Sequence, residues 1–455
     1  MTILLRDILK IALPVSLENI IANTGTFVIT VFLSQLGEVA VAINGVANQG
    51  LFLVMLFLFG LNTGGAIFIA QYWGKKDMEG IRKTTSLMIG FSLLISIAFF
   101  VFTFFFPKVF IKIFSSDVKV IENGVLYLRI ISISYFGLAL EMSFRTFLRA
   151  IEKATIPMMS YLYGTLFQTI FAFVLLKGVL GFPKLGLTGI ALTLTLSRFF
   201  IPLYQILKAA VSKLPFTFSF KDITAQYLKK FLEIATPTTL NEIFWSLGMT
   251  AYGVIFGKMG TQAYAARSIL SSFENYVWTF TLGVVVAASV FVGKFIGQME
   301  YEKALNFGKK VLFWNAAIGF ISSIVVVIIY YLISPTFEVE ESTKLLLTST
   351  MWVMAIGAPI KAFNGAAIVG VLRSGGDAKF AFLLETLTLW CLGVPLAFLG
   401  AFIWKQPLPI VYLLTLSDEI VKAIIAYVRI NSKKWIKNVT ISEEIIAPVG
   451  IDGEH

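Results

Sequence analysis

The chain has 455 residues, of which 57% are hydrophobic and only 14% are charged, and its mean hydropathy is +0.84. A soluble domain usually carries about 25% charged residues, and a globular fold of this length could not bury so much apolar surface. The composition therefore excludes an ordinary soluble protein. The net charge of +11 does not indicate a nucleic-acid partner, because the basic residues lie at the ends of apolar runs and form no single basic patch.

Apolar runs without Lys, Arg, Asp or Glu recur along the chain, for example at 39–74, 84–107, 154–176 and 311–337. A membrane helix needs about 20 predominantly apolar residues, whereas a barrel strand alternates in polarity over about ten. We therefore predict an all-α integral membrane protein. Its twelve transmembrane helices are expected at 8–34, 42–72, 84–106, 123–146, 156–177, 187–208, 230–256, 263–295, 308–333, 345–371, 380–403 and 408–430.

An even number of spans places both termini on one side of the membrane. The basic residues concentrate in the loops on that side, as in 75–83, 208–230 and 429–437, so the positive-inside rule predicts cytoplasmic termini. We expect the prokaryotic cytoplasmic membrane. The loops are too short for a nucleotide-binding domain, and no phosphate-binding G-x-x-x-x-G-K-[ST] motif occurs. Uphill transport would therefore need an ion gradient.

The two halves of the chain repeat each other. A shift of 223 residues aligns Pro14 with Pro237 and Gly74 with Gly297, and a shift of 224 aligns Arg149 with Arg373. Six helices per unit insert both units in the same direction, which predicts two six-helix lobes related by a pseudo-two-fold axis along the membrane normal. The predicted organisation is an N-terminal lobe (1–210), a cytoplasmic linker (211–228), a C-terminal lobe (229–431) and a cytoplasmic tail (432–455).

Pro, Gly and Cys residues suggest further local features. Pro14 and Pro237 fit either a helix start or a kink within a helix. Three G-x-x-x-G pairs, at 60–64, 253–257 and 293–297, favour close helix packing over a hinge. The single Cys391 excludes an internal disulfide and, within an apolar run, is expected to be buried.

The chain resembles the multidrug and toxic compound extrusion (MATE) family. The resemblance rests on IATPTTLNEIFWSLGMTAYGVIFGKMGTQAYAARSI and GKFIGQMEYEKA, echoed in the first half by IALPVSLENI, LSQLGEVAVAING and IAQYWGKKDMEGIRK, and it covers the chain to about residue 430. It implies a V-shaped pair of lobes, alternating access, and antiport of lipophilic, often cationic drugs or metabolites against Na⁺ or H⁺. In place of an aspartate common in the family, the first predicted helix has Ile29.

Two other functions remain as alternatives. A lipid-linked oligosaccharide flippase of the same superfamily would have a strongly cationic cavity and often extra helices. A membrane-embedded enzyme would need paired His or Asp in the membrane, but the one His is His455 at the C-terminus. We therefore expect a transporter rather than an enzyme, without a cofactor other than the coupling ion. The expected partners are a small lipophilic or cationic substrate and membrane lipid, and the protein is expected to be a monomer.

Charged residues within the predicted spans are candidate functional residues, because an unpaired charge in the bilayer costs several kcal/mol. Glu242, five residues after Pro237 and beside Asn241, is the first candidate for ion coupling or substrate contact. Family members with an acid on this helix use it for cation binding, and this resemblance makes Glu242 a candidate Na⁺ ligand or proton acceptor. Its alternative role is a structural salt bridge, with Lys361 as the possible partner.

Glu274 is the second candidate for ion coupling or Na⁺ binding. Arg267 lies two helical turns earlier, and the pair could form a polar stripe facing a cavity or a purely structural ion pair. A Lys at 361 would compete with a metal ion and favour proton or ion-pair chemistry. Glu18 lies one position away from the repeat equivalent of Glu242 and is a further candidate.

Other charged and aromatic residues have more conventional explanations. Asp418 with Lys422, and Glu141 with Arg145, are four residues apart and should pair locally, which leaves Glu419 without a partner. Aromatic side chains near the acids could hold flat cations in a cavity or could simply face lipid. The candidate cavity aromatics are Trp245, Tyr276 and Trp278.

Overall fold

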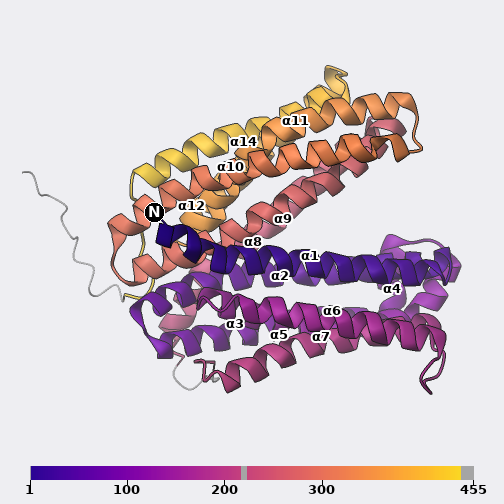
Figure 1. Ribbon diagram of the computed structural model, residues 1–455, viewed down its shortest axis with the longest axis horizontal. Coiled ribbons are helices and arrows are strands. Elements are labelled where there is room, and N and C mark those ends of the chain that lie inside the picture. Colours follow the sequence, from indigo (N-terminus) through magenta and orange to yellow (C-terminus); the bar gives the residue numbers. More distant parts are fainter. Residues whose placement is uncertain (1, 217–222, 442–455) are drawn as a thin grey trace, which may run out of the picture.

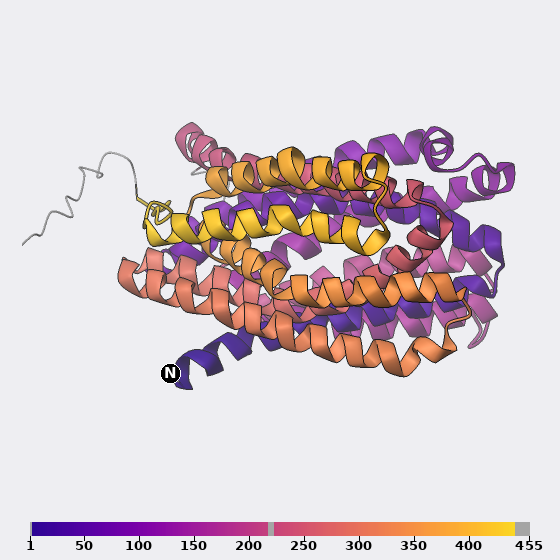
Figure 2. The same cartoon turned by 90° about the horizontal axis from the view of Figure 1, so that it is seen from above.

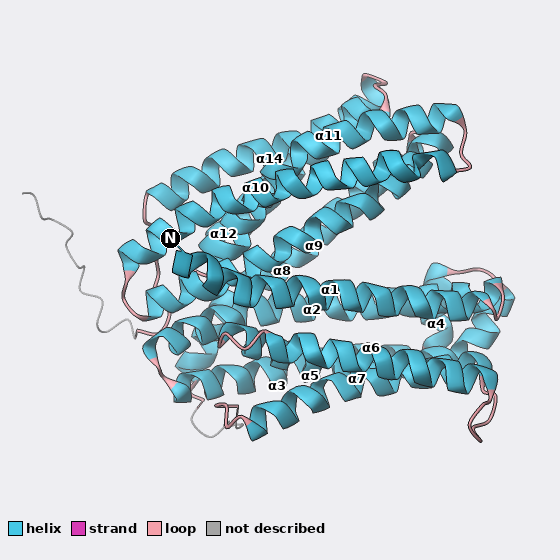
Figure 3. Cartoon of the chain, viewed as in Figure 1, coloured by secondary structure: helices cyan, strands magenta, loops and turns pink. Residues whose placement is uncertain are grey.

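The computed structural model describes residues 2–216 and 223–441, and every regular element among them is helical (Figure 3). Residues 217–222 of the predicted linker lie outside the described residues. So do the residues of the predicted tail from 442 onward. The N lobe consists of α1 (Thr2–Ser34), α2 (Glu38–Lys75), α3 (Met78–Phe105), α4 (Pro107–Phe114), α5 (Val118–Ala150), α6 (Thr155–Lys177) and α7 (Gly186–Val211).

The C lobe has the same order of long helices. It consists of α8 (Ala225–Lys258), α9 (Thr261–Gly297), α10 (Tyr301–Ile333), α11 (Glu341–Gly365), α12 (Ala378–Thr388), α13 (Val394–Phe398) and α14 (Leu408–Asn431). The short 3₁₀ segment η1 (Ser334–Thr336) follows α10, and the π-helical segments η2 (Ala366–Arg373), η3 (Leu389–Gly393) and η4 (Leu399–Ile403) continue α11, α12 and α13. Two spans are therefore composite. One runs from α11 through η2 (Glu341–Arg373), and the other runs from α12 through η4 (Ala378–Ile403).

All twelve predicted membrane helices are present, and most extend a turn or two beyond the predicted bounds. Among the described residues, ten helices are long and apolar enough to cross a membrane by length and composition alone. The two long helices outside that set, α8 and α14, are those that carry Glu242 and the charged group from Asp418 to Lys422. The short α4 was not predicted, because its eight residues follow the uncharged run ending at 107 and include Lys108 and Lys112.

The two lobes meet at one end and diverge toward the other (Figure 1). Figure 2, turned by 90°, likewise places the start of α1 and the end of α14 at the end where the lobes meet. The contact is formed by α2 of the N lobe against α8 and α9 of the C lobe, and by α1 against α9. This arrangement confirms the predicted pair of six-helix lobes.

The contacts between the lobes are reciprocal, as expected across a two-fold axis. A Cβ at Gly74 would overlap the carbonyl oxygen of Lys294, and a Cβ at its repeat equivalent Gly297 would overlap that of Gln71. The 223-residue shift also aligns Gln71 with Lys294. The pseudo-two-fold axis therefore passes between α2 and α9 at this end, where glycine allows the two backbones to touch.

Two of the three predicted G-x-x-x-G pairs pack as expected. A Cβ at Gly60 or Gly64 would collide with the α8 backbone, and one at Gly293 with Ala70. The prediction was wrong for the third pair, since nothing lies within 4 Å of a Cβ at Gly253 and only the Tyr264 ring lies near one at Gly257.

The structure decides two local predictions, on the helix prolines and on Cys391, and it also shows the surroundings of Ile29. Pro14 and Pro237 both lie inside their helices, about three turns from the start, so the interpretation as helix-start prolines is wrong. Ile29 is buried among apolar side chains of the N lobe, including Leu33 and Ala172. Cys391 is exposed, contrary to the prediction, because it lies with Trp390 on the outward face of η3, while Leu389 on the other face packs into the core.

The chain after α14 returns across the contact between the lobes. Trp435 is fully buried against Gly308 and Gly375, and its indole N–H donates to the Ile430 carbonyl at 2.9 Å. The Gln71 amide of α2 accepts from the Val439 backbone N–H at 2.8 Å and donates to the Lys437 carbonyl at 3.2 Å. This segment therefore ties the C-terminal end of the chain to both lobes.

Truncating Trp435 to Ala is expected to lower the free energy of unfolding by about 3–5 kcal/mol, because it leaves a large cavity in the apolar core cluster that contains this side chain. Thermal unfolding of the purified protein in detergent would measure the loss. Trp404→Ala is the control, since that side chain is exposed and should change stability by about 0.5 kcal/mol or less. Equal losses in both variants would contradict this account of the tail.

Candidate functional site

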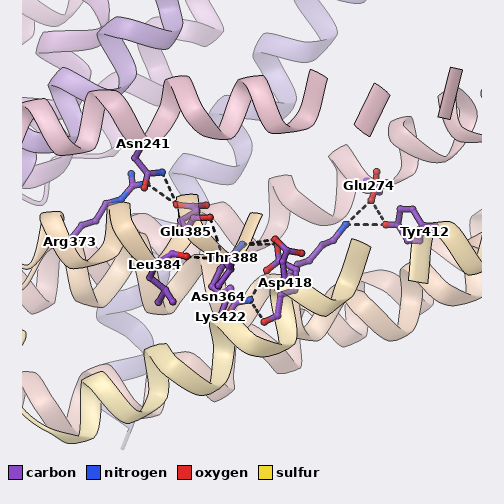
Figure 4. A network of polar contacts seen from close by, with 12 residues as sticks. Asn241, Glu274, Asn364, Arg373, Leu384, Glu385, Thr388, Tyr412, Asp418 and Lys422 are labelled. Atoms are coloured by element: carbon purple, nitrogen blue, oxygen red, sulfur yellow. Dashed lines mark hydrogen bonds and ion pairs between the residues drawn. The ribbon is translucent and has the colours of Figure 1, made fainter. Parts of the chain in front are cut away.

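The C lobe contains a buried ion-pair cluster built around Arg373, at the end of η2 (Figure 4). Its guanidinium, only 2% exposed, donates to Glu242 of α8 at 2.8 Å and to Glu385 of α12 at 3.3 Å. The amide nitrogen of Asn241 also donates to Glu385, at 2.7 Å. We call these four residues the Arg373 cluster. Two acids thus share one cation, and the cluster links three segments of the lobe.

The suggested pairing of Glu242 with Lys361 is wrong. Lys361 belongs to a second group, the Glu274 cluster, where its ammonium donates to Glu274 of α9 at 3.0 Å. Arg267 donates to the other carboxylate oxygen at 2.8 Å, which confirms the predicted Arg267–Glu274 pair. The Tyr412 hydroxyl of α14 bonds to both Glu274 and Lys361. Lys361 lies twelve residues before Arg373 in the same helical run, about 18 Å along its axis, which explains why Lys361 does not reach Glu242.

A third group, the Lys422 cluster, lies between these two (Figure 4). Lys422 contacts Asp418 at 3.4 Å, as predicted from their spacing, and also Glu419 at 3.1 Å. The Asn364 side chain of α11 donates to the Glu419 carboxylate at 2.5 Å. The prediction that Glu419 lacks a partner is therefore wrong, because helical geometry places residues three apart on the same face as well.

Glu18 belongs to a corresponding cluster in the N lobe, which we call the Arg145 cluster. Glu18 is 1% exposed and contacts Arg149 at 2.9 Å and Arg145 at 3.5 Å. Arg145 also contacts Glu141 at 3.2 Å, as predicted, and donates to the Tyr161 hydroxyl at 3.2 Å. Arg149 was not among the predicted site residues. Its alignment with Arg373 was the signal that could have identified it.

The three candidate cavity aromatics, Trp245, Tyr276 and Trp278, all have exposed side chains. This exposure fits both a lipid-facing and a substrate-facing position, so their role stays a prediction. The aromatic contacts of the Glu274 cluster are instead made by Phe256 and Tyr412, whose ring centres each lie 5.7 Å from the Arg267 guanidinium. Such contacts hold the cation in place without an additional acid.

The described residues contain no group of three or more His, Cys, Asp or Glu that could hold a metal ion. Glu242 shares Arg373 with Glu385, and Glu274 is bonded to both Arg267 and Lys361. A cation entering either place would need to share the carboxylate with Arg or Lys. Their role as Na⁺ ligands stays a prediction.

Removing the Tyr412 hydroxyl with Tyr412→Phe is expected to cost about 1.5–3 kcal/mol of stability, because that hydroxyl bonds two charged groups. The ring, and so the contact with Arg267, is retained. Chemical or thermal unfolding in detergent checks the value. Tyr163→Phe, at an exposed ring, is the matched control, and an unchanged stability of Tyr412→Phe would mean that the hydroxyl bonds contribute nothing.

Comparisons with known proteins cover most of the chain. The MatE family model matches residues 14–174 and 237–399. The transporter YisQ of Bacillus subtilis, described as uncharacterized, is 24% identical and covers 94% of this chain and 93% of its own. The probable multidrug resistance protein NorM of Thermotoga maritima is 22% identical, with coverage of 98% and 96%.

Solved structures share the fold at low sequence identity. The MATE transporter VcmN of Vibrio cholerae superposes with a TM-score of 0.87 at 15% identity, covering 96% of this chain and 98% of its own. A transporter of the MOP superfamily from Pyrococcus furiosus gives a TM-score of 0.83 at 16% identity, with 96% of each chain covered. The family match falls on two stretches of similar length, one in each half of the repeat.

Proposed function

This chain belongs to the MatE family, the multidrug and toxic compound extrusion transporters, and we propose that it is a cation-coupled antiporter. In this proposal it exports lipophilic, often cationic drugs or metabolites by alternating access, in exchange for entering Na⁺ or H⁺. The integral membrane location and a small-molecule efflux role follow from the family. The coupling ion, the direction of exchange and the substrate class are the proposed part.

The observation that supports coupling most strongly is the Arg373 cluster. Two carboxylates, on α8 and α12, share one buried guanidinium, so a cation that binds either acid competes with Arg373 for it. Taking one partner away from a buried charge costs about 3–5 kcal/mol, enough to change which arrangement of helices is favoured. Cation binding can therefore be linked to a movement of α8, the helix that packs on the N lobe through α2.

The lobe arrangement supports alternating access. The lobes are joined at one end, where α1 and α2 pack on α8 and α9 (Figure 1), and with cytoplasmic termini, as we propose, the diverging end faces outward. At Gly60, Gly74 and Gly297 the backbones of the two lobes approach each other directly. The inward-open state would require the glycine contacts between the lobes to separate and the diverging ends of the lobes to come together.

A lipid-linked oligosaccharide flippase is the alternative. The buried clusters of the C lobe have mixed charge, with five acids against four bases, and do not form a cationic surface for a pyrophosphate-linked lipid. The acids are Glu242, Glu274, Glu385, Asp418 and Glu419, and the bases are Arg267, Lys361, Arg373 and Lys422. This balance favours export of drugs or metabolites.

Reconstitution into liposomes with ethidium as the probe tests the proposal. A pH gradient and a Na⁺ gradient are imposed separately on the same preparation, with protein-free liposomes as the control. We expect one of the two gradients to drive ethidium across the membrane against its concentration gradient. If neither does so, and a labelled lipid-linked sugar is flipped without a gradient, the flippase function replaces the antiporter.

A further inference from the structure

One arginine at membrane depth in the N lobe has no countercharge bonded to it. Arg198 lies midway along α7, a helix long and apolar enough to cross a membrane. Within 2–216 and 223–441, its guanidinium forms no ion pair and no hydrogen bond, whereas Arg145 and Arg149 of the same lobe are both paired with acids. A charge at this depth is costly unless a partner neutralises it, so Arg198 is a candidate binding residue.

The side chain of Arg198 points into the lobe and not toward lipid. The outer face of α7 is formed by Leu196, Leu203 and Leu207, each about half exposed. Because an α-helix has 3.6 residues per turn, Arg198 lies on the face opposite to these leucines. A Cβ added to Gly137 of α5 would lie 3.2 Å from the Cβ of Arg198. The side chain therefore leaves α7 on the side that packs against α5.

The guanidinium nevertheless reaches accessible space. Arg198 is partly exposed, although it lies on the inward face of its helix. In the described part of the chain, the buried side-chain atoms without a hydrogen-bond partner include Nε of Arg149 but no nitrogen of Arg198. Since Arg198 makes no hydrogen bond, its nitrogens are unpaired and still accessible. A small anionic group can therefore approach them from inside the N lobe.

The surroundings of Arg198 have a surplus of positive charge. The Tyr161 hydroxyl of the Arg145 cluster interacts electrostatically with Arg198 and with three charged members of that cluster. The cluster contains two acids, each in contact with at least one of two arginines. These four residues are Glu18, Glu141, Arg145 and Arg149. With Arg198, three guanidinium groups surround two carboxylates, which gives this group of described residues a formal charge of +1.

The internal repeat shows what α7 lacks. A shift of 220 residues aligns Arg198 with Asp418 of α14, and Pro202 with Lys422. In the C lobe, Lys422 contacts Asp418 from one turn along the same helix, at 3.4 Å. In the N lobe, the uncharged Pro202 occupies that position. The charge at 198 is reversed relative to its repeat equivalent, but the helix supplies no opposite charge one turn later.

We propose that Arg198 binds the anionic group of a transported substrate, and that the substrates therefore include lipophilic compounds with one carboxylate, zwitterions among them. A guanidinium can hold a carboxylate through two parallel hydrogen bonds. One surplus positive charge matches one carboxylate and not a pyrophosphate. The inference deepens the proposed export function and rests on it, because it names a chemical class of substrate. Chloride has the same charge as a carboxylate and is the competing occupant.

Binding of rhodamine B and of its ethyl ester to the purified full-length protein in detergent tests the proposal. The two dyes share one aromatic cation, and the ester lacks the free carboxylate. Fluorescence polarisation in chloride-free sulfate buffer measures both affinities. The ratio of the rhodamine B affinity to the ester affinity should be higher in wild-type protein than in Arg198→Gln by about tenfold or more, as for a hydrogen bond between charged groups. Added chloride should lower the wild-type ratio by competition.

Two further arginine variants distinguish binding from a general charge effect. Arg198→Lys keeps the charge and should retain part of the preference for rhodamine B. Arg82→Gln removes an exposed arginine from α3 and should give the wild-type ratio. The melting temperature separates binding from a structural role. Arg198→Gln should not lower it, because no bonded acid loses a partner, whereas Arg149→Gln should lower it by leaving Glu18 with a weaker partner.

Equal affinity ratios in wild-type protein and Arg198→Gln overturn the inference. So does an equal loss of the preference in Arg198→Lys and Arg198→Gln combined with a lower melting temperature in both, since Arg198 would then be structural. If chloride raises the melting temperature of wild-type protein but not of Arg198→Gln, while the dye ratios stay equal, the occupant is chloride and the assigned substrate class is wrong.

Failure of this inference is distinct from failure of the proposed function. If a gradient drives ethidium transport but the dye ratios do not depend on Arg198, antiport stands and the carboxylate site is wrong. If the ratios depend on Arg198 but neither gradient drives ethidium or rhodamine B across the liposome membrane, anion binding at Arg198 stands and antiport fails.

Discussion

Replacing Glu242 by Gln is expected to reduce gradient-driven ethidium transport to the level of protein-free liposomes, while the protein still folds. The variant loses the carboxylate that, in the proposed mechanism, exchanges Arg373 for the coupling cation, whereas the Gln carbonyl oxygen can still accept from Arg373. The stability loss should therefore stay below the roughly 3–5 kcal/mol of removing a partner of a buried charge outright. Transport in liposomes and thermal unfolding in detergent measure the two effects.

An exposed acid provides the control for Glu242→Gln. Glu79 pairs with Lys83 on the helix surface, 67% exposed, and Glu79→Gln should transport normally. Full gradient-driven transport by Glu242→Gln would remove this residue from the coupling mechanism. Arg373 would then be a structural element that holds α8 against α12.

Replacing Gly74 by Val is expected to open the end at which the lobes meet and to abolish transport. Its Cβ would overlap the Lys294 carbonyl oxygen, which belongs to the backbone of α9 and cannot move aside alone. Spin labels on cysteines at Lys153 and Lys303, with Cys391 replaced, would report the distance between the lobes at this end. We expect a shift of the distance distribution to longer values.

Gly253 is the matched control for the Gly74 variant. It lies within α8, and a Cβ at this position has nothing within 4 Å, so Gly253→Val should leave the distance distribution and transport unchanged. If Gly74→Val gave the wild-type distribution, the glycine contact between α2 and α9 would not determine how the lobes close.

The fold could be predicted largely from sequence, because a helix that crosses the lipid bilayer must be a long run of apolar residues. Each long uncharged run had to become a helix, and the repeat then required two lobes. The reciprocal contacts of Gly74 and Gly297 were implicit in their alignment. The environment of Cys391 was misjudged, because an apolar run in a membrane protein can face either lipid or the lobe interior.

The candidate site was harder to predict because its partners come from separate helices. Pairs within one helix, such as Arg267 with Glu274, followed from helical spacing. The partner of Glu242 is Arg373, 131 residues later, and no periodicity connects the two. The Glu18–Arg149 and Glu242–Arg373 pairs show that part of the chemistry repeats with the scaffold, although the two acids lie one residue out of register.

The most direct test of cation-coupled antiport is to drive the cation with the substrate. Liposomes containing the protein, at equal pH and equal Na⁺ on both sides, receive ethidium outside only, and dyes inside report pH and Na⁺. The account predicts that ethidium entry drives H⁺ or Na⁺ out, and that Glu242→Gln shows neither movement. Ethidium entry without any cation movement, or with cations moving inward alongside it, would contradict antiport.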